Sequence, residues 1–244
     1  MLRGLYTAAT GMNHELKRQD AIANNLANVN TAGFKKDDMI GAAFHEELYF
    51  AIDRRSVQPI GTAPLGVETD QFYTHFTPGD LITTENPLDL AIMGEGYFVI
   101  EANGNQYLTR NGHFTRNADG YLVTDTGDLV IGEKGPIRLN GPVEISADGM
   151  VIVNPQVVDR LLVVTPNDAA SLVKEGNSRL LFTGGWTRLE TPLVQQGAYE
   201  NSNVNTIEEM VKMIAVTRAY ESNQKVIAVA DEVMNKIVNE LGRV

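Results

Sequence analysis

The residue types that most often form metal or catalytic sites are few in this 244-residue sequence. The histidines are His14, His45, His75 and His113, and no two of them have the short spacing of metal ligands on one helix or loop. The chain contains no cysteine, which excludes disulfides, thiolate nucleophiles and cysteine metal ligands. We therefore expect no metal site.

Glycines and aspartates gather at two places where a binding loop could be suspected. Residues 94–96, Gly-Glu-Gly, are too short for the glycine-rich loop of a dinucleotide site, and no helical pattern follows them. Asp119, Asp125 and Asp128 lack the spacing of an EF-hand calcium loop, and the neighbouring glycines favour turns instead. Neither place predicts a cofactor.

Serine-based catalysis has equally little support. Ser146 and Ser171 do not lie in the glycine-flanked strand-to-helix turn that exposes a nucleophile. A hydrolase whose site is assembled from distant residues, with His113 or Asp119 needed for turnover, is kept as an alternative hypothesis. The leading expectation is a protein that is not an enzyme, with no cofactor and no small-molecule substrate.

The two ends of the chain must therefore be considered for their packing, because both carry apolar residues at helical spacing. The N-terminal set is Leu5, Ala9, Met12, Leu16, Gln19, Ala23 and Leu26, and the C-terminal set is Tyr220, Ile227, Ala230, Met234, Ile237 and Leu241. This seven-residue frame is typical of helices that pack side by side as a coiled coil. It predicts one helix over 3–28 and another over 206–241.

The ends of these helices also have recognisable signals. Thr206 and Glu209 have the spacing of a capping box, with Thr206 as the N-cap of the second helix. The asparagines at 28 and 30 favour the end of the first helix. Gly33, just after it, is expected to adopt a backbone conformation that a β-carbon would forbid.

Both predicted helices carry apolar residues outside these seams. Examples are Ile22, Val216, Val226, Val229 and Val238. A helix that is apolar over more than one stripe has more than one partner. We therefore expect neighbouring subunits to complete the packing of the helices.

Between the ends, short runs of strand-forming residues alternate with turn residues. The strand candidates are 97–100, 121–123, 129–131, 143–145, 150–153 and 161–164. Asn-Gly or Asp-Gly pairs at 103–104, 111–112, 119–120 and 148–149 supply the positive φ of tight hairpin turns. These signals predict an antiparallel β domain.

The segment 36–80 gives weaker signals. Apolar residues between Phe44 and Ile52 favour one or two helical turns, and the prolines and glycines of 59–66 favour an extended or irregular stretch. The predicted fold class is α+β, with N- and C-terminal helices paired as a coiled-coil-like stalk and an inserted antiparallel all-β domain. The expected domains are a helical one of 1–35 plus 200–244, an extended linking segment of 36–80 and a β-rich domain of 81–195.

The net charge of −11 is unevenly distributed. Residues 1–35 carry four basic and two acidic side chains and residues 205–244 carry five and six, so the acidic excess lies in the middle. Nucleic acid as a partner is disfavoured, because it requires clustered basic residues. No apolar run reaches the roughly 18–20 residues of a membrane span, and the first residues are typical of a mature helix rather than a secretory signal.

Several short strings resemble the signatures of the bacterial flagellar basal-body rod and hook proteins. The terminal strings are NLANVNTAGFK at 25–35, SNVN at 202–205, EEMV at 208–211 and RAYE at 218–221. Those of the β domain are NPLDLAI at 86–92, GEGYF at 94–98 and TRNGHF at 109–114. The ordered set identifies the chain as a member of this family over nearly its whole length. VIGEKGPI at 130–137 and the chain length most resemble the proximal rod branch, with the distal rod branch as the close alternative.

The resemblance implies a structural, axial subunit of the flagellar basal body. Such proteins pass through the flagellar type III export apparatus without a cleaved signal and stack with themselves and other rod proteins. They form a hollow periplasmic rod that transmits torque, without nucleic acid and without insertion into a membrane. We expect subunit contacts at Leu5, Met12, Leu16, Asn25, Leu26, Asn28, Phe34, Asn203, Asn205, Ile214, Tyr220, Ile227, Met234 and Ile237.

One alternative comes from a different class of protein. A secreted adhesin or binding module would use residues 81–190 to recognise a polymer. That hypothesis predicts ligand binding by the β domain alone, whereas the leading hypothesis places the essential contacts on the terminal helices.

Overall fold

Two long helices form at the ends of the chain, as the apolar spacing predicts. In the computed structural model, which describes residues 2–53, 56–168 and 171–241, they are α1 (Leu2–Ala27) and α2 (Thr206–Leu241). Contacts within the chain are dense in two units. The first contains the described residues of 1–27, 37–75 and 205–244, and the second contains 28–36 and 76–204.

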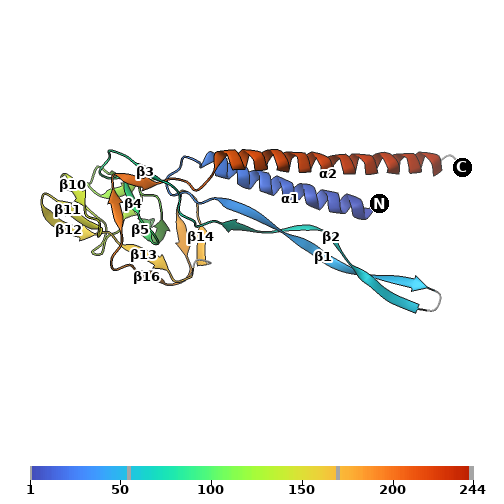
Figure 1. Ribbon diagram of the computed structural model, residues 1–244, viewed down its shortest axis with the longest axis horizontal. Helices are drawn as coiled ribbons and strands as arrows, with labels where there is room; N and C mark the ends of the chain where they lie inside the picture. The colour runs from blue at the N-terminus through green and yellow to red at the C-terminus, as the bar shows by residue number, and fades with distance from the viewer. Residues whose placement is uncertain (1, 54–55, 169–170, 242–244) are drawn as a thin grey trace. The chain divides into compact units, whose positions relative to one another are not determined.

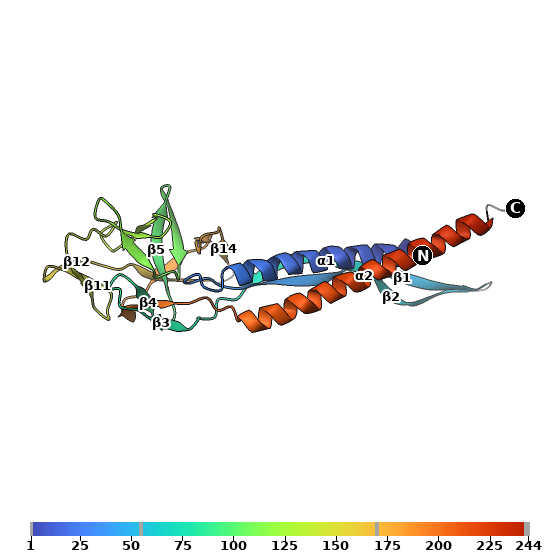
Figure 2. The same ribbon diagram turned by 90° about the horizontal axis from the view of Figure 1, so that it is seen from above.

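In the first unit, α1 and α2 pack side by side in opposite directions (Figures 1 and 2). Asn25, near the end of α1, contacts Glu209 near the start of α2, and Gly11 faces Asn223. Ile22 and Val216 are almost fully buried. The expectation that these two residues contact other subunits is wrong, because partners within the chain cover them. The paired helices and the antiparallel β domain confirm the predicted α+β class.

A long hairpin provides the second partner of α1. Strands β1 (Asp37–Asp53) and β2 (Ser56–Thr74) pair antiparallel from Asp37 opposite Thr74 to Asp53 opposite Ser56. The prediction of helical turns between Phe44 and Ile52 is wrong. The aromatic residues there and Ile52 suit a strand, and pairing with β2 satisfies the backbone groups of the segment.

Glycines let α1 lie close to this hairpin. A β-carbon on Gly41 would lie 2.6 Å from Cε1 of His14, and one on Gly66 would lie 2.4 Å from Oγ1 of Thr10. A larger residue at either position would separate the helix from the strands. The hairpin is thus fitted to one side of α1 while α2 covers another.

The second unit consists of short strands. They are β3 (Leu81–Thr83), β4 (Leu90–Ile92), β5 (Tyr97–Ala102), β6 (Asn105–Thr109), β7 (Phe114–Arg116), β8 (Leu122–Thr124), β9 (Leu129–Val130), β10 (Val143–Ile145), β11 (Met150–Val153), β12 (Gln156–Arg160), β13 (Val163–Pro166), β14 (Leu172–Lys174), β15 (Leu180–Phe182), β16 (Trp186–Arg188), β17 (Val194–Gln196) and β18 (Ala198–Glu200). All strand pairs among the described residues are antiparallel.

The largest sheet of this unit has nine strands. Seven run in the order β14-β15-β6-β5-β9-β8-β7, and β13 joins through β5 and pairs with β16. A three-stranded sheet, β10-β11-β12, and the pairs β17-β4 and β18-β3 complete the unit. The predicted turn at 103–104 is confirmed, because Asn103 and Gly104 have φ of 53° and 79°.

The predicted turn at 111–112 is wrong. Asn111 is buried, and Gly112 packs so closely on β4 that a β-carbon would lie 1.6 Å from the Leu90 carbonyl oxygen. The Leu90 amide donates to the Gly112 carbonyl at 2.9 Å, so the segment joins a neighbouring strand. The glycine is needed there for close approach and not for a turn.

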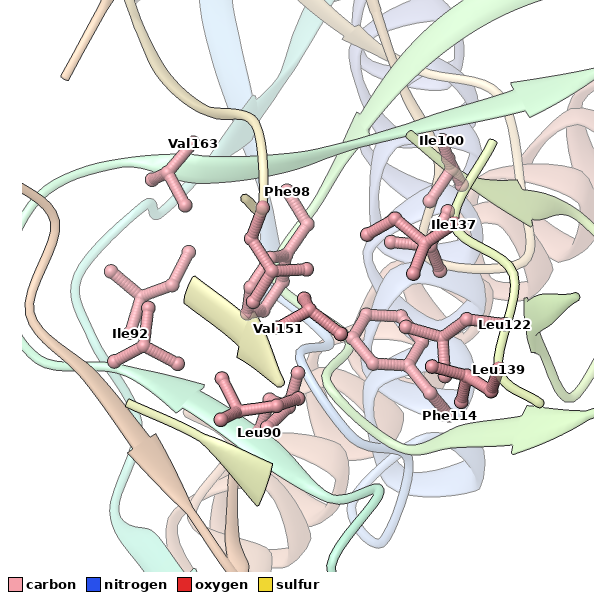
Figure 3. Close-up of a cluster of buried hydrophobic side chains, with 14 of the residues drawn as sticks. Leu90, Ile92, Phe98, Ile100, Phe114, Leu122, Ile137, Leu139, Val151 and Val163 are labelled. Atoms are coloured by element: carbon pink, nitrogen blue, oxygen red, sulfur yellow. The ribbon is translucent and has the colours of Figure 1, made fainter. Parts of the chain in front are cut away.

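An apolar core holds the strands of the second unit together (Figure 3). Phe98 and Phe114 meet edge to face with ring centroids 5.3 Å apart. Leu90, Leu122 and Val151 surround them and are fully buried. Such a core stabilises the β unit mainly by removing apolar surface from water.

Candidate assembly interface

The start of α2 is fixed by Asn205. Its Oδ1 accepts hydrogen bonds from the amides of Ile207 at 3.0 Å and Glu208 at 3.2 Å, as an N-cap residue does. The predicted capping box of Thr206 and Glu209 is wrong. The Glu209 carboxylate binds elsewhere, with Lys212 Nζ 2.9 Å away and Asn25 Nδ2 3.3 Å away, so it does not reach back to the cap.

A buried polar network joins α1, β1 and α2. Asn25 has no exposed surface, and its Oδ1 accepts from the Asp37 amide at 3.0 Å. Its Nδ2 donates to the Asp37 carbonyl at 2.8 Å and to Glu209. Every polar atom of this amide is therefore used inside the chain. A role of Asn25 between subunits stays a prediction.

Lys212 extends the network along α2. Burial of its ammonium lowers the pKa of Lys212, but hydrogen bonds to Glu209 and Glu208 and the charge of Asp38 outweigh that effect and raise the pKa above its usual value. Asp38 in turn lies 2.8 Å from Nε2 of His75. These charges hold the first turns of α2 beside the base of the hairpin.

The opposite side of these first turns is apolar and exposed. Ile207, Met210, Val211 and Ile214 are 76%, 52%, 61% and 54% exposed. Their spacing places them in one stripe, on the side of α2 turned away from the buried Glu209. We call these four residues the outer stripe. Four large apolar side chains in one exposed stripe are typical of a surface that binds another protein.

A second exposed apolar set lies nearer the end of α2. It consists of Val226, Val229, Val233, Ile237 and Val238. Successive residues turn by about 100° around the helix axis, so most of this set lies on a different side of α2 from the outer stripe. The helix therefore presents apolar surface in two directions that no described part of the chain covers.

The apolar helix residues predicted to make subunit contacts divide between these environments. Half-buried positions are Leu5, Met12, Leu26, Tyr220, Ile227 and Met234, whereas Leu16, Ile214 and Ile237 are exposed. The structure thus uses part of the predicted seam to pack the chain on itself. Their role in subunit contacts stays a prediction.

The predicted residues of 28–36 lie in the second unit and make contacts there. Asn28 Oδ1 accepts from Thr31 Oγ1 at 3.2 Å. Phe34 is buried beneath Lys174, whose Nζ is 4.2 Å from the ring centroid. Asn203 Oδ1 accepts from the Lys36 amide at 2.8 Å. Phe34 thus packs the segment after α1 against β14, and Asn203 joins the two terminal segments to each other.

A buried ion cluster in the same unit was missed by the sequence reasoning. Glu200 accepts from Lys35 Nζ, from Arg110 Nη1 at 3.2 Å and from the Gly79 amide at 2.9 Å. Burial of the ammonium lowers the pKa of Lys35, and the Glu200 carboxylate opposes that effect. The three charges come from positions far apart in the chain, so no local spacing signals them.

The residues considered for catalysis are not brought together. His113 Nδ1 lies 2.7 Å from Asp89 Oδ1, while Asp119 lines an open hollow of about 490 Å³ formed by turn residues. No group of three or more metal-binding side chains exists among the described residues. No helix in the described part of the chain is long and apolar enough to cross a membrane.

Comparison with protein families assigns three parts of the chain. Residues 5–35 match the model described as "Flagella basal body rod protein". Residues 91–154 match "Flagellar hook protein FlgE/F/G D1 domain", and residues 195–241 match "Flagellar basal body rod FlgEFG protein C-terminal". The matched regions include most of both helices and much of the β unit.

Three relatives align along almost their whole length. The flagellar basal-body rod protein FlgF of Caulobacter vibrioides is 34% identical, over 94% of this chain and 94% of its own. FlgG of Agrobacterium fabrum, also a flagellar basal-body rod protein, is 32% identical, with coverage of 98% and 100%. The flagellar hook-basal body complex protein FlhO of Bacillus subtilis is 29% identical over both complete chains.

Proposed function

We infer a structural role from one premise, that this chain belongs to the family of flagellar basal-body rod proteins. The chain is a structural subunit of the flagellar rod in the basal body, and it assembles with other rod components. Its task there is to transmit torque through packed contacts, without catalysis. The observation that carries this role is the outer stripe of α2, because an isolated subunit leaves it exposed.

The position along the rod is proposed from finer resemblance. We place the chain in the proximal rod, with the distal rod as the alternative. The FlgF relative and the string at 130–137 support the proximal position. The similar identity to FlgG relatives supports the alternative.

The route to the rod and the contact residues follow from the same role. The chain is exported by the flagellar type III apparatus and forms part of a hollow shaft in the periplasm. The exposed residues among the predicted contacts, including Leu16, Ile214 and Ile237, contact neighbouring subunits. The half-buried seam residues support these contacts by fixing the helix pair.

A truncation tests the role of the helices. We propose deleting residues 230–244 in the native host and purifying basal bodies from cells that carry the variant or the full-length chain. The variant is expected to be absent from basal bodies and to leave cells non-motile, while the β unit still resists proteolysis. Normal incorporation of the truncated chain would contradict the proposal.

A further inference from the structure

The register of the two helices can be read from two separate contacts. Asn25 binds Glu209, and a β-carbon on Gly11 would lie 3.0 Å from Nδ2 of Asn223. In both pairs the two residue numbers sum to 234, so Leu2 at the start of α1 lies opposite position 232. The residues of α2 from 233 onward therefore continue past the start of α1, as Figure 1 shows.

This continuation, residues 233–241, is called the α2 extension. It is roughly 13 Å long at about 1.5 Å per residue. Ile227, Ala230, Met234 and Ile237 follow one another at spacings of four and three, so the side of α2 that faces α1 keeps its pattern into the extension. The apolar spacing of α2 thus continues beyond the N-terminal end of α1, the helix on which this side of α2 packs.

The extension also carries exposed apolar side chains. Val233, Ile237 and Val238 are 40%, 37% and 69% exposed. An apolar helix end of this kind is marginal in water unless another surface packs on it. The unchanged spacing indicates that the missing partner is another helix of the same kind as α1.

We propose that the α2 extension packs against α1 of a second copy of this chain. The proposal rests on the proposed function, because the rod brings copies together. A second copy presents a fitting surface on the outward side of its α1, where Ala9, Leu16 and Ala23 are exposed at seven-residue intervals. The two alanines allow close approach, as Ala8 and Gly11 do within the subunit.

The same side of α2 would then form two interfaces, one after the other along the helix. Residues before 232 pack on α1 of their own chain, and residues after it pack on α1 of another copy. The contact is heterologous, because the extension of one copy meets a different surface on the next. Contacts of this type build rings or helical assemblies of many copies, unlike the self-complementary contact of a two-fold dimer.

Disulfide trapping tests the contact cleanly, because the chain has no cysteine of its own. Val238→Cys is combined in turn with Ala9→Cys, Leu16→Cys and Ala23→Cys, and basal bodies from the native host are oxidised. The matched control combines Leu16→Cys with Ala230→Cys, since Ala230 faces α1 within its own subunit. A disulfide requires Cα atoms within about 7 Å, so only neighbouring helices can be trapped.

At least one Val238→Cys pair is expected to give bands of two or more copies on a non-reducing gel, whereas the control pair gives none. The proposal is overturned if all three double-cysteine variants are incorporated into basal bodies and yet migrate only as single chains. A band that joins the Val238→Cys chain to a different rod protein would also overturn it. If the unmodified chain is itself absent from basal bodies, the proposed function fails together with this inference.

Discussion

The side-chain amide of Asn25 donates a hydrogen bond to the carboxylate of Glu209, with Nδ2 and Oε2 3.3 Å apart, although the two residues are 184 positions apart in sequence. The same amide exchanges two hydrogen bonds with the backbone of Asp37. One side chain therefore connects both terminal helices and the hairpin. We expect the geometry of the first unit to depend on it.

Replacing Asn25 tests this connection. Asn25→Ala leaves the Asp37 backbone groups and the Glu209 carboxylate short of a partner, and we expect the free energy of unfolding to fall by about 2–3 kcal/mol. Urea unfolding followed by circular dichroism measures the loss. Asn13→Ala, at an exposed position of the same helix, has the same change in helix propensity and serves as the control. Equal stability of the two variants would contradict the assigned role of Asn25.

Glu200 is the second position where removal of one charge should matter. Glu200→Gln leaves the buried cations Lys35 and Arg110 without their shared carboxylate, and we expect a loss of about 3–5 kcal/mol. Glu133→Gln, which removes a carboxylate near Arg188 at the surface, is expected to cost less than about 1 kcal/mol. Thermal unfolding of both variants distinguishes the buried cluster from the surface pair. A small effect at Glu200 would show that the cluster is dispensable.

Gly33 is expected to tolerate no side chain. Its φ is +66°, and a β-carbon would lie 2.2 Å from the Asn111 amide nitrogen. A left-handed backbone conformation alone costs a residue with a β-carbon about 1–2 kcal/mol. Because of the added clash, Gly33→Ala should lower the free energy of unfolding by more than this. Gly4→Ala, in α1 with open space around it, should instead stabilise by about 0.5–1 kcal/mol. Opposite shifts of the unfolding midpoint are the expected result, and a neutral Gly33→Ala would contradict it.

His14 should make the first unit sensitive to mild acid. Burial against the hairpin lowers the pKa of His14 below 6.5, with the charge of Glu15 opposing and those of Arg18 and Lys17 assisting. Between the lowered pKa and 6.5 the unfolded chain binds more protons, so this contribution to stability is complete above pH 6.5 and falls as the pH drops through the window. The stability of the wild type should therefore fall more steeply below pH 6.5 than that of His14→Gln. Parallel pH profiles would exclude this role.

The parts of the fold that sequence could predict are those with local patterns. The spacing of residues such as Met12 and Ile227 predicts the two helices, and Asn103-Gly104 predicts a hairpin turn. The hairpin of β1 and β2 was missed because the apolar residues between Phe44 and Ile52 favour helical turns, while the prolines and glycines of 59–66 interrupt the strand pattern of β2. Its pairing satisfies backbone groups in a way that no short window reveals.

The site was predictable only in part for a similar reason. Seam spacing identifies apolar helix faces, but it does not tell which face packs inside the chain. Ile22 and Val216 became buried once the hairpin and the partner helix were in place. The Glu200 cluster depends on residues that only the complete fold brings together.

The most direct test of the assembly role is a charge on the outer stripe. Val211→Asp and Ile214→Asp change exposed positions, so the isolated subunit should keep its fold and stability. We predict that neither variant is found in basal bodies purified from the native host, while Gln224→Asp, at another exposed position of α2, is incorporated normally. Normal amounts of folded Val211→Asp and Ile214→Asp protein in the rod would contradict the account.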